Sequence, residues 1–322
     1  MTIQDHAVLS HTIWSMQDAA YATHFMHLSS GEFIVGYHDG VIKIKSFAAE
    51  KVFPATHSQL LSILALQNEK VLISSHEDGK LYFWNRATRQ LISKLATGRV
   101  CSILELPDGI LAMGMKNSNI VLLDLETQET VAQFGTPSLH VGDILMLLPT
   151  GELMSGRRDT GALFVWDIEH KRREKCFRTH ADIYALTLLP DGQHIATSHR
   201  NGNIYVWNIA EERCVAELSD NRLLIHSLVA LSNDYLAAGD AEGNIKVWDI
   251  KTQQCVTVIP VKKTRSSLIC PTYVNLLTLL PDDCLAYVTN YEAGVIDLAY
   301  VRQRDVSAHA QPHTHLAFSM GM

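Results

Sequence analysis

The chain has 322 residues, of which 47% are hydrophobic and 19% charged, and its formal net charge is −7. These proportions are typical of a soluble globular protein, and the negative charge disfavours a nucleic-acid binder that depends on phosphate contacts. No apolar run approaches the ~20 residues that span a bilayer, and the first residues, MTIQDHAVLSHTIW, lack the pattern of a secretory signal. We therefore expect a cytoplasmic protein that does not insert into membranes.

In chain order, a lone apolar run at residues 8–14 is followed by seven similar units. Each unit contains a turn and a short strand, which read DGVIKIK, DGKLYFW, NSNIVLL, TGALFVW, NGNIYVW, EGNIKVW and AGVIDLA. The residues two and four places after the glycine position are apolar in every copy, which indicates a strand with one buried face. Four copies end in tryptophan, and the last three of these (Trp166, Trp207 and Trp248) are 41 residues apart.

Each unit supplies three more strands around this one. An apolar run such as FIVGY or VLISS precedes it, and before most of these runs a strand ends in a turn such as LELPDG. A more polar run, such as QLISKL, follows it. Units of four antiparallel strands and about 40 residues are the blades of a β-propeller. We predict an all-β fold, a seven-bladed β-propeller of four-stranded antiparallel blades, in which residues 1–322 form one domain and residues 311–322 a flexible tail.

The lone run at residues 8–14 has no partner strand nearby in the sequence. We expect it to supply the outer strand of the last blade, because this closes the ring and removes exposed sheet edges. The alternative is that residues 315–320 close the ring.

The units resemble the WD-repeat family. Trp166-Asp167 and Trp248-Asp249 carry the dipeptide that names the family, and Trp84-Asn85 and Trp207-Asn208 are near matches. The resemblance implies a structural hydrogen-bond relay in which a His, a Ser or Thr, a turn Asp and the Trp of one blade take part. Two units match it with the same spacings, through His57, Ser74, Asp78 and Trp84, and through His180, Thr197, Asn201 and Trp207. The first and last units, with Lys45 and Ala299 at the tryptophan position, depart from it most.

Several motifs suggest chemistry, but each has a simpler interpretation. The His-Asp-Ser set resembles a hydrolase triad, yet it recurs in a second unit, as a structural relay would and an active site would not. The triplet Asp159-Thr160-Gly161 is shared with aspartic proteases, but it stands at a strand-joining turn and has no second copy. The three tail histidines (His309, His313 and His315) match no recognised zinc pattern. We therefore predict a protein that is not an enzyme, with no catalytic residue, no cofactor and no metal ligand.

The six cysteines include no Cys-x-x-Cys pair, and Cys176, Cys214 and Cys255 fall in matching segments of successive repeats. This placement is typical of small strand fillers with reduced thiols, as in the cytosol. The degraded relays would suit a stand-alone protein, including a bacterial protein that works in the cytosol of a host cell.

One spacing is irregular. The last two repeats are 51 residues apart, whereas the others are 39 to 43 apart, and the excess falls at residues 260–273. In the WD-repeat family this connection lies on the face that carries the turn before each tryptophan strand, which we call the front face. Lys262, Lys263 and Arg265 would add a positive patch there, because loops concentrate binding residues. The alternative is a tolerated insertion without function.

Propellers that resemble this chain usually bind partners on the front face, near the central opening. The residues that project there are Tyr21, His38, Gln59, Glu77, Arg99, Lys116, Asp143, Asp159, Asp182, Tyr184, Arg200, His226, Tyr273, Asn275 and Glu292. Their mixture of aromatic and charged types is typical of interface hot spots, and the alternating charges favour a polar or bipolar peptide.

We predict a non-catalytic scaffold or adaptor for protein–protein interaction, monomeric within a complex, whose partners are proteins or peptides. One alternative is a dedicated reader of a peptide or a modified residue, with Tyr184 and Tyr273 in a central pocket. The other is a propeller enzyme, for which Asp143, Asp159 and Asp182 are the only acids that would converge at the channel.

Overall fold

The computed structural model describes residues 10–15, 22–46, 49–54, 56–117, 119–135, 144–156, 161–179, 182–219, 223–232, 234–261, 273–280, 284–289 and 292–298. Within these residues the secondary structure is β-strand, apart from a single 3-10 turn at Pro107–Gly109. No helix among them has the length and apolar character needed to cross a membrane. Five cysteines in this part of the chain are free thiols.

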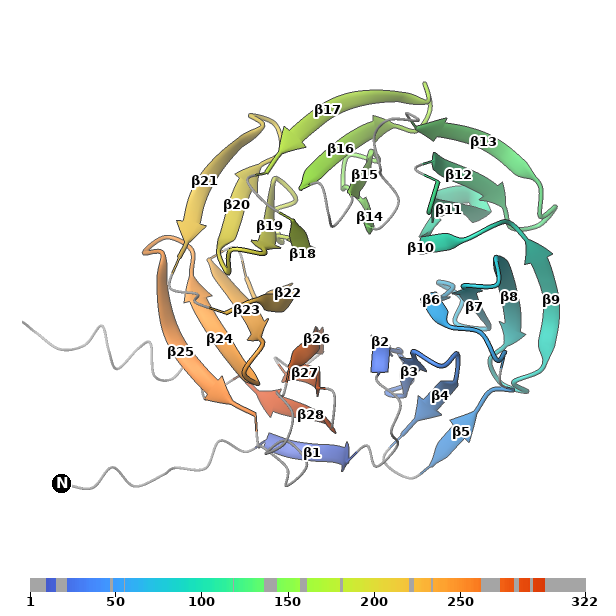
Figure 1. Ribbon diagram of the computed structural model, residues 1–322, viewed down its shortest axis with the longest axis horizontal. Helices are drawn as coiled ribbons and strands as arrows, with labels where there is room; N and C mark the ends of the chain where they lie inside the picture. Colours follow the sequence, from blue (N-terminus) through green and yellow to red (C-terminus); the bar gives the residue numbers. More distant parts are fainter. Residues whose placement is uncertain are drawn as a thin grey trace, which may run out of the picture.

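The strands form seven four-stranded antiparallel sheets, which stand as blades around a central opening (Figure 1). Blade 1 consists of β2 (Ala22–His27), β3 (Phe33–Tyr37), β4 (Ile42–Lys45) and β5 (Glu50–Val52). Blade 2 consists of β6 (Leu60–Ala65), β7 (Val71–His76), β8 (Lys80–Asn85) and β9 (Leu91–Ala96). Blade 3 consists of β10 (Val100–Leu106), β11 (Ile110–Met115), β12 (Asn119–Asp124) and β13 (Thr130–Gly135). Blades 4 and 5 are β14 (Ile144–Leu147), β15 (Leu153–Gly156), β16 (Ala162–Asp167) and β17 (Arg172–Arg178); and β18 (Ile183–Leu188), β19 (His194–His199), β20 (Ile204–Asn208) and β21 (Arg213–Leu218). Blades 6 and 7 are β22 (Ile225–Ala230), β23 (Tyr235–Asp240), β24 (Asn244–Asp249) and β25 (Gln254–Pro260); and β26 (Val274–Leu280), β27 (Cys284–Thr289), β28 (Glu292–Asp297) and β1 (Ser10–Ser15). The predicted seven-bladed propeller is confirmed.

The seventh blade takes its outer strand from the beginning of the chain. β1 pairs antiparallel with β28, with Ser10 opposite Ile296 and Ser15 opposite Glu292. Figure 1 shows β1 on the outside of this blade. The prediction that the N-terminal run closes the ring is therefore confirmed.

The hydrophobic core lies between neighbouring blades. Trp248 of blade 6 is fully buried in one cluster with Leu218 of blade 5. Trp84, Trp166 and Trp207 likewise pack in clusters that include the preceding blade. Because each unit buries its tryptophan strand against its neighbour, one sequence pattern recurs around the ring.

Serine hydroxyl groups also join neighbouring blades. Ser75 Oγ donates to the Val100 carbonyl of the next blade at 3.0 Å, and Ser198 Oγ donates to the Ile225 carbonyl at 3.0 Å. Between blades 6 and 7 the hydroxyl comes from the inner strand instead, because Ser227 Oγ donates to the Val274 carbonyl at 2.9 Å. In each pair the acceptor is the first residue of the innermost strand of the next blade.

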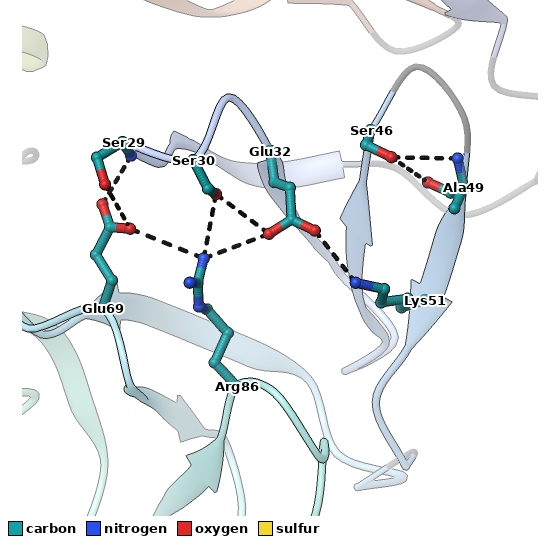
Figure 2. A network of polar contacts seen from close by, with 8 residues as sticks. All are labelled: Ser29, Ser30, Glu32, Ser46, Ala49, Lys51, Glu69 and Arg86. Atoms are coloured by element: carbon teal, nitrogen blue, oxygen red, sulfur yellow. Dashed lines mark hydrogen bonds and ion pairs between the residues drawn. The ribbon is translucent and has the colours of Figure 1, made fainter.

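On the back face, opposite the front face, a polar network links blades 1 and 2 (Figure 2). Glu69 of blade 2 accepts from the backbone nitrogen and the hydroxyl of Ser29 in blade 1, at 2.7 and 2.9 Å. Arg86 lies between two acids, with NH1 3.4 Å from Glu32 and 3.8 Å from Glu69. The hydrogen bond from the Ser29 backbone, followed by that from its hydroxyl and by the charge of Arg86, holds the pKa of Glu69 below its ordinary value.

Blade 1 carries Lys45 at the tryptophan position, opposite Phe33, as predicted. Its ammonium group is 2.9 Å from Glu50, and that of Lys43 is 3.0 Å from the same carboxylate. Burial alone would raise the pKa of Glu50, but the two ammonium groups outweigh it and lower the pKa. A lysine that is 7% exposed is thus tolerated here because its charge is paired.

Blade 7 differs from the prediction in register. Ile296 lies opposite Leu285, as Trp248 lies opposite Leu236 in blade 6, so Ile296 and not Ala299 takes the tryptophan position. Gly294 is not a turn glycine but lies within β28, opposite Tyr287. An added Cβ at Gly294 would stand 2.5 Å from the Tyr287 hydroxyl, so the glycine makes room for this buried ring.

Candidate functional site

A cavity of about 810 Å³ lies in the central opening, between the inner strands of the blades. Of the predicted residues, Gln59, Tyr184, His226 and Asn275 line it. Thr23, His24, Cys101 and Ser102 line it as well and were not predicted. These four residues lie near the start of the innermost strand of their blade, as the predicted ones do, and this shared position in the repeat is the signal that could have identified them.

The innermost strands bulge where they meet the cavity. In six blades the pairing with the second strand shifts between the first and third residues of the inner strand. The residues skipped by these shifts are Thr23, Leu61, Cys101, Tyr184, His226 and Asn275, and all six line the cavity. A bulge re-aims a side chain at the rim of a sheet, and here it directs one residue of each of these six blades into the channel.

Three aromatic rings from blades 5, 6 and 7 form a row at the cavity. His226 is in the middle, with its ring centroid 5.8 Å from that of Tyr184 and 5.3 Å from that of Tyr273. The two pairs meet edge to face, at interplanar angles of 86° and 71°. Such arrangements are favourable for aromatic pairs, so the row presents a large and ordered apolar surface beside the cavity.

The predicted charged residues of the front face form two groups. Glu77 is 3.1 Å from Arg99 and 3.5 Å from Lys116, so that two cations of blade 3 share one carboxylate of blade 2. In blade 5, Arg200 is 3.3 Å from Asp182. Arg99, Lys116 and Arg200 remain about half exposed or more, which leaves them accessible to a partner.

The other residues predicted for the front face either lie away from the cavity lining or fall outside the described residues. His38 is exposed at the turn after β3. Glu292, predicted at a turn, begins β28 and pairs with Ser15, a consequence of the shifted register of blade 7. Tyr21, Asp143, Asp159, Lys262, Lys263 and Arg265 lie outside the described residues, as do the tail histidines.

A hydrogen-bond relay is present in blade 2, but with a different histidine from the one predicted. Trp84 Nε1 donates to Ser74 Oγ at 2.9 Å, and Ser74 Oγ lies 2.9 Å from His76 Nε2. His76 Nδ1 is 3.0 Å from the Ser58 carbonyl oxygen. The expectation for His57 is thereby corrected, because His76 extends from the strand toward Ser74, whereas His57 stands in the preceding loop with a φ of 55°.

Blade 5 repeats this arrangement. Trp207 Nε1 donates to Thr197 Oγ1 at 2.9 Å, and Thr197 Oγ1 is 2.7 Å from His199 Nε2. The predicted His180 lies outside the described residues. In both blades the histidine precedes the tryptophan by eight residues, a sequence signal that would have identified it.

The predicted turn residues of the relay bind tyrosine rather than histidine. The Asp78 carboxylate accepts from Tyr82 Oη at 2.8 Å and from Lys80 Nζ at 3.0 Å, and Asn201 Nδ2 donates to Tyr205 Oη at 3.0 Å. Burial alone would raise the pKa of Asp78, but these hydrogen bonds and the Lys80 charge lower it. Asp78 and Asn201 therefore secure the turn and the neighbouring tyrosine.

In blade 6 the tryptophan lacks its acceptor. Ala238 holds the position of Ser74 and Thr197, and Trp248 Nε1 is buried with no hydrogen-bond partner among the described residues. We expect Ala238→Ser to raise the free energy of unfolding by about 1 kcal/mol, because the new hydroxyl would satisfy this nitrogen. Urea denaturation measures the effect, with Ala237→Ser as a control that buries a hydroxyl on the other side of the strand. A less stable Ala238→Ser protein would contradict this account of Trp248.

No group of three His, Cys, Asp or Glu side chains that could hold a metal ion occurs among the described residues. In a comparison with known families, residues 171–208 match the model described as "WD domain, G-beta repeat". The matched segment runs from the outer strand of blade 4 through the first three strands of blade 5, where Trp207, Thr197 and His199 form their relay. No curated protein matches the chain.

Proposed function

The chain is a WD-repeat β-propeller, and from this premise we propose that it is a non-catalytic scaffold which binds partner proteins on the front face around the central cavity. Propellers of this family are commonly protein-interaction scaffolds and are generally non-enzymatic. Because one fold serves many functions, the argument for this chain rests on its own site.

The observation that carries the proposal is the aromatic row of Tyr184, His226 and Tyr273 beside the cavity. Aromatic residues dominate the binding energy of protein interfaces, because they bury a large area at a small cost in side-chain entropy. The row is already ordered by its own ring contacts, so a partner would not have to order it.

The charges supply the polar part of the same surface. The aromatic row belongs to blades 5 to 7, whereas the group of Glu77, Arg99 and Lys116 lies across the ring in blades 2 and 3 (Figure 1). In that group two cations share one carboxylate, so it carries a positive excess. We propose that the partner segment is extended, crosses the opening, and presents apolar side chains to blades 5 to 7 and an acidic group to blades 2 and 3.

Affinity capture from lysate with quantitative mass spectrometry tests this proposal. We expect a Tyr184→Ala/Tyr273→Ala variant to retain about tenfold less of its partners than the wild type, as is typical for truncated hot spots. The matched control carries Lys251→Ala and Thr252→Ala in the back-face turn of blade 6 and should retain them fully. Equal retention by the tyrosine variant and the wild type would refute the front-face assignment.

The central cavity favours a second candidate, a reader of one peptide or modified residue, since Tyr184 lines it and Tyr273 contacts the His226 ring. The two candidates differ in how the binding energy is distributed over the partner. An alanine scan of a bound partner segment would show one dominant side chain for a reader and several comparable ones for a scaffold.

A further inference from the structure

A groove of about 490 Å³ lies at the outer rim of the ring, between blades 1 and 2. Val52 and Leu91 form parts of its two walls and are 47% and 44% exposed. The floor includes Phe53, which is 2% exposed and meets Trp84 edge to face with ring centroids 5.8 Å apart. The groove is therefore accessible, apolar on its walls and firmly supported from below.

Arg89 lines this groove. Its Nε is buried without a hydrogen-bond partner among the described residues. Three acids of blades 1 and 2 are paired with other cations, since Glu32 and Glu69 contact Arg86 and Glu50 contacts Lys45. None of these three acids lines the groove. The Arg89 side chain as a whole is only partly buried, so a ligand carboxylate at its accessible part gains a charge-assisted hydrogen bond.

Blade 3 shows how the same position is satisfied elsewhere. Gln128 holds the place of Arg89 in its turn, with a φ of 56° against 60°, and its Nε2 donates to Ser93 Oγ of the preceding blade at 3.0 Å. In blade 1 the residue that corresponds to Ser93 is Lys51, because Ser93 lies opposite Phe83 and Lys51 opposite Ile44. An ammonium group cannot accept a hydrogen bond. The neighbouring blade therefore has no acceptor at the position where Gln128 meets a hydroxyl, and the Lys51 ammonium is instead 3.3 Å from Glu32.

We propose that this groove is a second binding site, separate from the front face, for an extended segment of a partner protein that carries a carboxylate between apolar side chains. The carboxylate accepts from the Arg89 guanidinium, a charge-assisted hydrogen bond that is stronger than a neutral one. The apolar side chains cover Val52 and Leu91. The occupant follows from charge complementarity, because Arg89 is the one charged side chain among the described residues that line the groove. The others are the apolar Val52, Phe53, Pro54 and Leu91 and the uncharged Thr88 and Gln90.

Methyl NMR of the full chain tests this site, with acetyl-Leu-Glu-Leu-amide as the probe and acetyl-Leu-Gln-Leu-amide as its uncharged counterpart. We expect the acidic peptide to shift the Val52 and Leu91 methyl resonances and to bind about fivefold more tightly than the glutamine peptide. Arg89→Gln should abolish this preference, and its fold should be intact because Gln128 and Gln253 hold the same turn position. Lys171→Gln, at that position in blade 4, is the matched control and should keep the preference.

The proposal is overturned if both peptides bind equally, or if Arg89→Gln retains the preference for glutamate. It is also overturned if neither peptide shifts the Val52 and Leu91 resonances. In the absence of peptide, the Val52 and Leu91 methyl resonances should not depend on protein concentration. If they do, a second copy of the chain occupies the groove, and the proposal is overturned as well.

Discussion

Ser74→Ala is expected to lower the free energy of unfolding by about 3 kcal/mol. The hydroxyl accepts from Trp84 Nε1 and contacts His76 Nε2, both at 2.9 Å, and all three residues are at most 3% exposed. Removing it leaves two buried polar groups without a partner, and each such loss costs about 1–3 kcal/mol. Equilibrium unfolding in urea, followed by tryptophan fluorescence, measures the change.

The matched control for this prediction is Ser75→Ala, the adjacent buried serine. Ser75 Oγ is 3.0 Å from the Val100 carbonyl oxygen and 3.5 Å from that of Ser62, and its single proton can be donated to only one of them at a time. Its removal therefore costs one hydrogen bond and should lower the free energy of unfolding by only about 1 kcal/mol. If Ser74→Ala were no more destabilising than Ser75→Ala, the relay would not have the structural role assigned to it.

Gly239→Ala is the second change with a large expected effect, again a loss of about 3 kcal/mol. A Cβ at this position would lie 2.6 Å from Val274 Cγ1 and closer still to Ser227 Oγ, in the contact between blades 6 and 7. Val274 is β-branched and fully buried, so its side chain has little freedom to move away. Urea denaturation again measures the loss.

Ser75→Ala is also the control for this substitution, because Ser75 holds the same strand position in blade 2. There the interface already accommodates a Cβ, and the change removes the hydroxyl that donates to the Val100 carbonyl at 3.0 Å. We expect a loss of about 1 kcal/mol. Comparable losses for Gly239→Ala and Ser75→Ala would show that steric exclusion at Gly239 is unimportant.

Most of the fold could be predicted from sequence, because a propeller repeats one pattern of burial. The alternating apolar residues and the 41-residue spacing of the tryptophans follow from strands that bury one face against the next blade. The prediction for blade 7 was wrong at Gly294, which was assigned to a turn because the other units have a turn glycine at that place in the repeat. Its missing side chain instead accommodates Tyr287, a tertiary contact that no local pattern reveals.

The candidate site was predictable only in part. Position along the repeat placed Tyr184 and His226 near the opening, but the bulges that direct them into the cavity are a property of strand pairing. The relay histidine was misplaced because His57 matches the family spacing, while His76 is held by the Ser58 carbonyl, a contact made only in the folded blade.

Site-specific photo-crosslinking tests the central claim, that partners bind on the front face around the cavity, most directly. A photoreactive phenylalanine analogue would replace Tyr184, beside the cavity, in one protein and Thr252, on the back face of blade 6, in another. We predict that partners crosslink in lysate to position 184 and not to position 252. Partners that crosslink to position 252 and not to position 184 would contradict the claim and place the binding surface on the back face.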